Sequence, residues 1–323
     1  MKTTEPTTLI EAIRFFADPD VAREFMVSLR WPNGVACPTC GLVEPTWLAS
    51  VGRWQCKGKH PKRQFSVKVG TIMEDSPIGL DKWLATIWMV VNDKNGISSY
   101  EVARSIGVTQ KSAWFMLQRV RLALEDGTFN RLKGEVEADE TYIGGKARNM
   151  HKDRKIKTFG TTKPSGHAGK AIVMGFIQRE GPDGHSVVRT AQIANPQRPT
   201  IEAKVRENVE PGSALYTDGL GSYRYLADEY AHGVVEHDAH EYVNGEITTN
   251  RIENFWALLK RTLSGTYITV EPFHLFRYLD EQVFRFNTRE MKDGDRFKVA
   301  AAAIVGKRLT YAQLISSGAQ SLA

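Results

Sequence analysis

Three cysteines constrain this chain more than any other feature, because all of them lie between positions 37 and 56. Cys37, Cys40, Cys56 and the following His60 give the spacing C-x2-C-x15-C-x3-H, which is typical of a zinc ribbon. Three buried, inert cysteines are the alternative, and His60 could be an ordinary surface histidine. We predict one structural Zn²⁺ held by these four side chains, with no coordination position left for catalysis.

Length and composition narrow the class of protein. The 323 residues suffice for two to three domains, and a hydrophobic share of 41% excludes wholesale disorder. The longest nearly apolar run, residues 83–91, is too short to cross a membrane, and the first residues do not resemble a secretion signal. The clustered cysteines favour a reducing compartment. A net charge of +6 and a pI near 9.1 permit a polyanionic partner.

Apolar periodicity and turn signals divide the chain into five expected segments. They are a helical segment over 1–30, a zinc ribbon over 31–72, a helix-turn-helix region over 73–130, an α/β domain over 131–290 and a tail over 291–323. In the α/β domain the order β-β-β-α-β-α-β-α predicts a mixed five-stranded sheet with helices packed on it.

Residues 98–124 have the pattern of a helix, a tight turn at Gly107 and a second helix. The second helix would present Gln110 and Lys111 to a DNA groove, and Arg119 would extend its basic face. We therefore predict that these three residues bind DNA. An ordinary helical hairpin with a solvated basic surface is the alternative.

Three acids occupy special positions in the α/β domain. Asp139 lies in its first strand, Asp218 closes a short later strand and Glu253 lies in the first turn of a helix that begins near residue 250. If the first and fourth strands are neighbours, the three carboxylates can gather around Mg²⁺ or Mn²⁺, which prefer oxygen ligands. With 37 acidic residues in the chain, three solvated carboxylates are an equally simple interpretation.

Neighbouring residues add to this interpretation. We expect Glu137 and Glu140, which flank Asp139, to point to the opposite face of the strand. Lys260 follows Glu253 by two helical turns, so it can hold a substrate phosphate, although it could also be a routine exposed lysine. Residues 144–170 contain eight Lys or Arg against one acid, which suits a DNA backbone or a solvated loop.

Taken together, these segments resemble the zinc-ribbon DDE transposases of the insertion-sequence 1595 family. The resemblance runs from about residue 10 to 290 and rests on the ribbon and on residues 63–76, 94–101, 137–145, 216–219, 249–261 and 278–289. It implies a ribonuclease-H-like catalytic fold with Asp139, Asp218 and Glu253 as metal ligands. Lys260 matches the lysine that follows the third acid in the family. His237 and His240 are similar to family sequence, but we assign them no role.

The resemblance implies DNA transposition: hydrolysis of phosphodiester bonds at the element ends, then attack of the freed 3′-hydroxyl on target DNA by two-metal-ion catalysis. The expected partners are the element ends, the target DNA and further copies of the chain assembled on DNA. We expect a cytoplasmic, nucleoid-associated protein of a bacterium or archaeon. The alternatives are a DNA-binding regulator and a structure-selective nuclease on the same fold.

Overall fold

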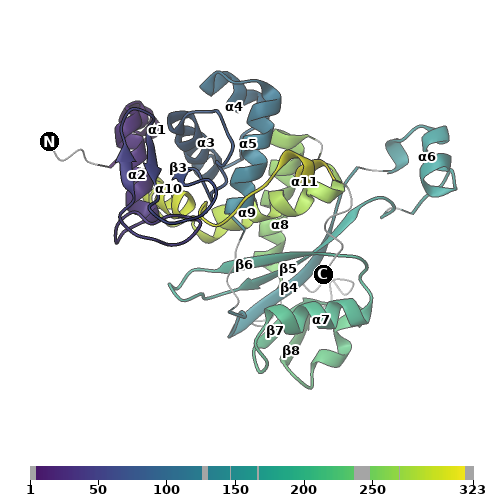
Figure 1. Cartoon of the computed structure of the whole chain (residues 1–323). Coiled ribbons are helices and arrows are strands. Elements are labelled where there is room, and N and C mark those ends of the chain that lie inside the picture. Colours follow the sequence, from purple (N-terminus) through teal and green to yellow (C-terminus); the bar gives the residue numbers. More distant parts are fainter. Residues whose placement is uncertain are drawn as a thin grey trace. The chain divides into compact units, whose positions relative to one another are not determined.

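The computed structural model describes residues 5–125, 130–145, 147–165, 167–235, 248–268 and 270–316 (Figure 1). They form two compact units. Unit 1 contains the described residues up to 125 together with 288–316, and unit 2 contains those between 130 and 287. None of the described helices is both long enough and apolar enough to span a bilayer.

Unit 1 is built around a buried central helix. Its helices are α1 (Leu9–Phe16), α2 (Pro19–Arg30), α3 (Leu80–Asn92), α4 (Ser99–Ile106), α5 (Gln110–Ala123), α10 (Asp293–Ala302) and α11 (Tyr311–Ile315). Eight of the 13 residues of α3 are buried, including Trp83 and Trp88. Trp88 packs against Phe297 of α10, and Phe297 in turn contacts Phe16 and Phe25 of the first two helices. This aromatic cluster forms the core of the unit.

The C-terminal segment corrects one of our predictions. We expected residues 291–323 to be a tail, but α10 and α11 belong to unit 1. Phe297, Ala300 and Ala301 of α10 are buried, and the N–H of Gly306 donates to the carbonyl of Gly70. The reason is apolar burial, since the face of α3 that α10 covers would otherwise be exposed to water. Unit 1 is therefore assembled from both ends of the described chain.

The zinc-ribbon segment contains three short antiparallel strands, β1 (Thr46–Leu48), β2 (Arg53–Gln55) and β3 (Gln64–Phe65). Trp47 is paired with Trp54 across β1 and β2, and Trp54 stacks on Phe65 of β3. Three strands this short bury little apolar surface beyond these rings. We therefore expect a bound metal to supply much of the stability of the ribbon.

The predicted helix, turn and helix between residues 98 and 124 are present as α4 and α5. Ser98 and Glu101 form a capping box at the start of α4, which favours helix initiation there. Gly107 ends α4 with a φ of 63°, a left-handed conformation that glycine adopts without a steric penalty. Thr109 then caps α5 by accepting from the N–H of Ser112.

Unit 2 contains the predicted mixed sheet of five strands, in the order β6-β5-β4-β7-β8. The strands are β4 (Glu135–Ile143), β5 (Ala171–Gln178), β6 (Val187–Ile193), β7 (Ala214–Asp218) and β8 (Ala231–Val235). β4, β5 and β6 run antiparallel, whereas β7 lies parallel to β4 and to β8. This is the arrangement expected of a ribonuclease-H-like domain, and it makes the first and fourth strands neighbours.

Helices cover both faces of this sheet (Figure 1). α7 (Arg198–Asn208) packs on one face through Ile201 and Val205, together with a 3₁₀ helix, Gly221–Leu226, where we expected an α-helix. α8 (Asn250–Thr262) and α9 (Leu275–Asn287) pack on the other face, with Phe255 and Leu259 of α8 buried in that core. The remaining short helices are Ala147–Asn149, Leu263–Tyr267, which is a π-helix, and Pro272–His274.

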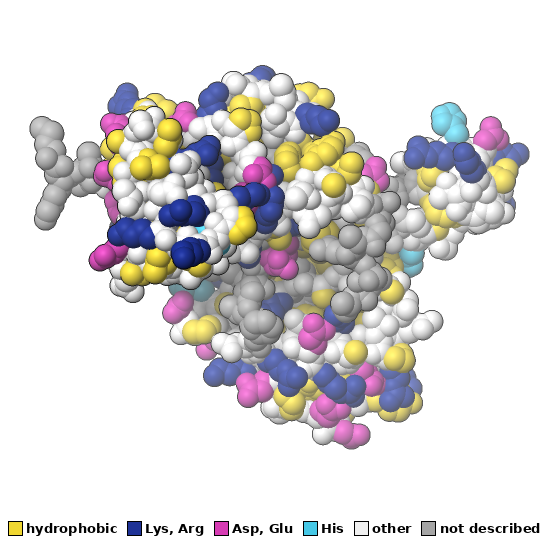
Figure 2. Space-filling view, in the orientation of Figure 1, with side chains coloured by type: hydrophobic (Ala, Val, Ile, Leu, Met, Phe, Trp, Pro, Cys, Tyr) yellow, Lys and Arg dark blue, Asp and Glu magenta, His cyan; other side chains and the backbone are white. Residues whose placement is uncertain are grey.

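The basic segment between β4 and β5 also contains a helix, α6 (Lys152–Phe159), which ends at Gly160. In Figure 1 this helix projects from one end of the sheet, and Figure 2 shows Lys and Arg side chains gathered on it. All residues of α6 are exposed or half-buried. The segment is therefore an extension of the β4–β5 hairpin with a largely cationic surface.

Candidate functional site

Cys37, Cys40, Cys56 and His60 form a compact group whose four ligand atoms all lie within 4.8 Å of one another. The Sγ of Cys37 is 3.4 Å from the Nε2 of His60, and the Sγ atoms of Cys40 and Cys56 are 3.6 Å apart. A tetrahedral zinc with Zn–S bonds of about 2.3 Å requires sulfur–sulfur separations of about 3.8 Å. The four side chains therefore fit a structural Zn²⁺, as the spacing predicts.

The surroundings of these ligands also suit a metal. Burial would raise the pKa of the Cys37 thiol, but the backbone N–H groups of Cys40 and Thr39 outweigh it and lower the pKa to about 6. A thiolate is the form that binds zinc. The Nδ1 of His60 lies 2.8 Å from the carbonyl of Pro61, which directs Nε2 toward the sulfur atoms.

Gly58 is a residue of this centre that sequence reasoning missed. A Cβ at position 58 would lie 3.2 Å from the Sγ of Cys40 and 3.3 Å from that of Cys56. Its N–H also donates to the Sγ of Cys56, at 3.2 Å. Only the glycine between Cys56 and His60 could have signalled this close approach.

The three acids of unit 2 come from elements that meet at one end of the sheet. β4 and β7 pair in parallel with Glu137 opposite Tyr216, so Asp139 and Asp218 each follow two residues later along neighbouring strands. Glu253 lies on the first turn of α8, which packs against β4 and β5. Burial, together with the charges of Asp218 and Glu253, raises the pKa of Asp139 to about 6. The three carboxylates are thus within electrostatic reach of one another.

Two donors orient the carboxylate of Asp139. The N–H of Glu140 donates to Oδ1 at 2.8 Å, and the indole Nε1–H of Trp256 donates to Oδ2 at 2.9 Å. Trp256 can approach this closely because Gly175 of β5 has no side chain, since a Cβ there would lie 2.5 Å from the indole ring. Neither Trp256 nor Gly175 was among our candidates, because only their packing gives them a connection to Asp139.

The flanking acids correct our expectation about strand faces. Glu140 does lie on the opposite face, where the hydroxyl of Tyr223 donates to it and burial raises its pKa to about 8. Glu137, however, shares the face of Asp139, because residues two apart on a strand point the same way. Its carboxylate is fully buried and accepts hydrogen bonds from the N–H groups of Arg251 and Ile252 in α8.

Lys260 lies on α8 two turns after Glu253, and both side chains are exposed. Phe255 and Leu259 are buried and Leu258 is half-buried, so this side of the helix provides packing. Lys260 is therefore available to a substrate. His237 and His240 lie outside the described residues.

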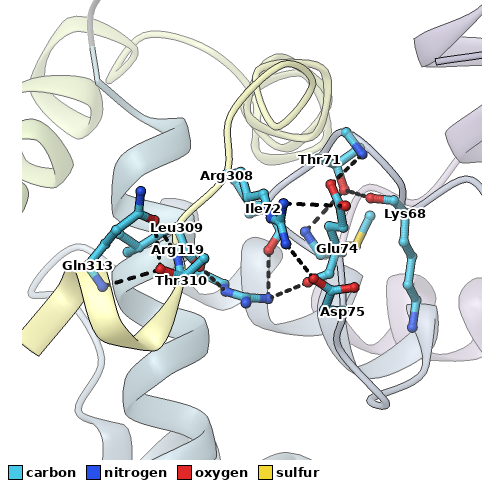
Figure 3. A network of polar contacts seen from close by, with 12 residues as sticks. Lys68, Thr71, Ile72, Glu74, Asp75, Arg119, Arg308, Leu309, Thr310 and Gln313 are labelled. Carbon is cyan, nitrogen blue, oxygen red and sulfur yellow. Dashed lines mark hydrogen bonds and ion pairs between the residues drawn. The ribbon is translucent and has the colours of Figure 1, made fainter. Parts of the chain in front are cut away.

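Arg119 is not a surface residue, which corrects its predicted place in the DNA-binding set. It is 7% exposed, and its guanidinium donates to the carbonyls of Ile72, Glu74 and Leu309, each at 3.0 Å (Figure 3). Three backbone acceptors from two distant segments explain its burial, because each carbonyl needs a donor. Arg119 therefore joins the C-terminal segment to the core of unit 1.

The other two predicted DNA-binding residues lie at the start of α5. Lys111 is exposed, and its ammonium lies 4.9 Å from the ring centre of Tyr311 in α11. Gln110 is half-buried and donates from Nε2 to the hydroxyl of Ser99 at 2.8 Å. Both contacts are with residues of unit 1, and Lys111 remains accessible to a phosphate.

Both sites lie in segments that match domains of the same family of known proteins. Residues 18–58 match a transposase zinc-ribbon domain, and residues 131–287 match an ISXO2-like transposase domain. The chain belongs to the insertion-sequence 1595 family of transposases. The first match contains the three cysteines of this transposase but ends before His60, which the structure places in the same group as a candidate fourth ligand.

Two relatives of the transposase are described as uncharacterized proteins. A protein in transposable element ISH50 of Halobacterium salinarum is 28% identical over 258 residues, covering 78% of this chain and 85% of that protein. A transposase-like protein of Haemophilus influenzae is 35% identical over 111 residues, covering 32% of this chain and 85% of that protein. The longer similarity includes most of both units.

Proposed function

We propose that this transposase cuts phosphodiester bonds at the ends of its element and joins the freed 3′-hydroxyl to target DNA, with Asp139, Asp218 and Glu253 as ligands of catalytic Mg²⁺ or Mn²⁺. One observation carries the proposal: the parallel pairing of β4 with β7, under α8, brings carboxylates from three distant segments to one end of the sheet. Membership of a transposase family supplies DNA as the substrate.

The donor set fits a hard divalent cation. All three side chains offer oxygen atoms, which suit Mg²⁺ and Mn²⁺. Burial and, after it, the repulsion from the other two carboxylates raise the pKa of Asp139. When bound, such ions supply charge stabilisation for an in-line displacement at phosphorus and lower the pKa of an attacking water. The transposase contributes the fixed carboxylates, and the N–H donors of Glu140 and Trp256 hold Asp139 in one orientation.

The substrate backbone would be held by cations on both units. Lys260 is exposed on the same helix as Glu253 and can bind a phosphate beside the carboxylates. The α6 extension offers further exposed Lys and Arg. In unit 1, the exposed Lys111 and the half-buried Gln110 lie at the start of α5, the part of that helix that would enter a DNA groove. Assembly of several copies on DNA belongs to the same proposal.

Cleavage and joining of a labelled element-end duplex test the proposal, with the end sequence taken from short inverted repeats that flank the gene. Asp139→Asn, Asp218→Asn and Glu253→Gln should each abolish both steps, because each removes an anionic metal ligand. DNA binding by the same preparations should persist. A folded variant that cuts at a near wild-type rate would remove that residue from the ligand set.

The same assay separates the alternatives. A structure-selective nuclease would cut the duplex without joining it to target DNA. A DNA-binding regulator would bind the ends, and neither wild type nor any variant would cut them in Mg²⁺ or Mn²⁺.

A further inference from the structure

The first turn of α8, which carries Glu253, is fastened to the strand that carries Asp139. We propose that Glu137 and Trp256 are positioning residues that dock α8 on β4 at two points and thereby set where Glu253 lies relative to Asp139. The inference rests on the proposed function, because it concerns the spacing of the proposed metal ligands. It assigns a task to a buried carboxylate and an indole N–H that bind no metal or substrate themselves.

The first contact is a helix cap supplied by a strand. The first N–H groups of a helix have no partners within the helix and carry partial positive charge. In α8, the N–H groups of Arg251 and Ile252 donate to Oε2 of Glu137 at 2.9 and 3.1 Å. A carboxylate with 0% exposure thus caps this helix from β4, while the hydroxyl of the preceding Thr249 donates to Glu253 itself at 3.0 Å.

Arg179, which directly follows β5, neutralises the charge of the capping carboxylate of Glu137. Its Nε donates to Oε1 of Glu137 at 2.9 Å, and its side chain is 8% exposed. Its Nη2 donates to the carbonyl of Thr248, and Arg251 donates back to the carbonyl of Arg179 at 2.6 Å. The segment that enters α8 is therefore fixed to two strands by directional hydrogen bonds around one buried ion pair.

The second contact lies one turn further along α8. The indole of Trp256 donates to Oδ2 of Asp139 at 2.9 Å, over the space left by Gly175. One contact alone would let the helix pivot about a point, whereas two contacts fix both its axial position and its rotation. Along the chain, Glu137 precedes Asp139 by two residues and Ile252 precedes Glu253 by one. The contact between Glu137 and Ile252 is therefore only two residues from Asp139 on β4 and one residue from Glu253 on α8.

A purely stabilising ion pair is the competing explanation, and unit 2 contains a matched control. Glu281 and Arg285 form a buried ion pair on α9, with Glu281 1% and Arg285 8% exposed. The hydroxyl of Tyr267 also donates to Glu281. Glu281→Gln therefore removes a buried charge of the same kind from a helix that carries none of the three acids.

The experiment compares Glu137→Gln, Trp256→Phe and Glu281→Gln in the full-length protein. For each variant we would measure the thermal midpoint, the affinity for the element-end duplex, and the cleavage rate over a series of Mg²⁺ and Mn²⁺ concentrations. Loss of a residue that orients metal ligands typically costs about 10-fold to 100-fold in activity or metal affinity. We expect Glu137→Gln and Trp256→Phe to lose activity in this range and to need more Mg²⁺ for half-maximal cleavage.

In both test variants the affinity for the duplex should be unchanged, and the cleavage rate should recover in part when Mn²⁺ replaces Mg²⁺. Glu281→Gln should instead lower the thermal midpoint and leave the Mg²⁺ requirement as in wild type. The proposal is overturned if both test variants keep the wild-type Mg²⁺ requirement, or if activity in all three falls only in step with the thermal midpoint. If Glu137→Gln does not fold, Trp256→Phe alone decides. Failure of the proposed function would look different: either the wild type would not cut and join the duplex, or a folded Asp139→Asn or Glu253→Gln variant would still cut it.

Discussion

The zinc centre and the carboxylate site of this transposase differ in how their residues are brought together. The four zinc ligands lie between positions 37 and 60, in a segment with three very short strands. The three acids lie at 139, 218 and 253 and meet only because five strands and α8 pack in one order. We expect the first site to need its metal to hold a local fold, whereas in the second the packing of the sheet and α8 holds together charges that repel one another.

Removal of zinc from the ribbon should produce the largest effect, because it should separate the two sites most clearly. Chelation of zinc, or Cys37→Ser, should unfold the ribbon and leave unit 2 folded, because the ribbon has few buried apolar contacts besides its aromatic rings. Hydrogen exchange should show protection lost over residues 46–65 and retained over 135–235. Native protein without zinc, or Cys37→Ser with undiminished zinc, would contradict the assigned ligands.

The carboxylate site should show the opposite behaviour, since its charges oppose folding when metal is absent. The pKa of Asp139 is raised to about 6 from 3.8, so the unfolded chain loses this proton first as pH rises. The stability of the metal-free protein should therefore fall between pH 4 and pH 6, by up to about 3 kcal/mol for this group.

Asp139→Asn should remove that part of the pH dependence and raise the thermal midpoint of the metal-free protein at pH 7. The gain should be partial, because an asparagine offers only one oxygen to the two donors, Glu140 N–H and Trp256 Nε1–H. Melting curves at pH 4 and pH 7 in a chelator measure the difference. If the stability of this variant depended on pH as in wild type, the ionisation of Asp139 would not be the cause of the loss of stability.

A substitution at Lys260 tests whether a proposed substrate contact behaves differently from the proposed metal ligands. Lys260→Ala should weaken cleavage by about 10-fold to 100-fold, the usual value of one charged hydrogen bond, and leave residual activity. Arg261→Ala is the matched control, because Arg261 is the adjacent exposed cation on α8. The initial cleavage rates of the two variants test this difference. Equal losses of rate would mean that Lys260 contributes only positive charge and makes no specific phosphate contact.

The smallest effect is expected at α5 in unit 1. Lys111→Ala should lower the slope of log affinity against log salt by about 1, because one phosphate contact is lost. Arg119→Lys should leave that slope unchanged and lower the thermal midpoint, because Arg119 bonds to three backbone carbonyls. Binding titrations at several salt concentrations test both, and identical slopes for wild type and Lys111→Ala would argue against docking through this helix.

The features that could be predicted from the sequence are those that depend on residues close together along the chain. Cysteine spacing predicts the zinc ligands, and the apolar residues Leu80, Leu84, Ile87 and Val91 recur with the helical period over α3, Leu80–Asn92. Capping residues and Gly107 mark α4 and α5, and the order of elements gives the mixed sheet. These features are predictable because capping, turn formation and periodic burial involve residues only a few positions apart.

Tertiary structure alone decided the partners of individual side chains. Glu137 and Arg119 look like ordinary charged residues in the sequence, yet one caps α8 from a strand and the other joins residue 309 to residue 72. Similarly, α10 completes a core that begins at α1, and Trp256 reaches Asp139 over Gly175. Such pairings link residues about 50 to 280 positions apart. No local propensity encodes them, because only packing of the whole unit determines which groups meet.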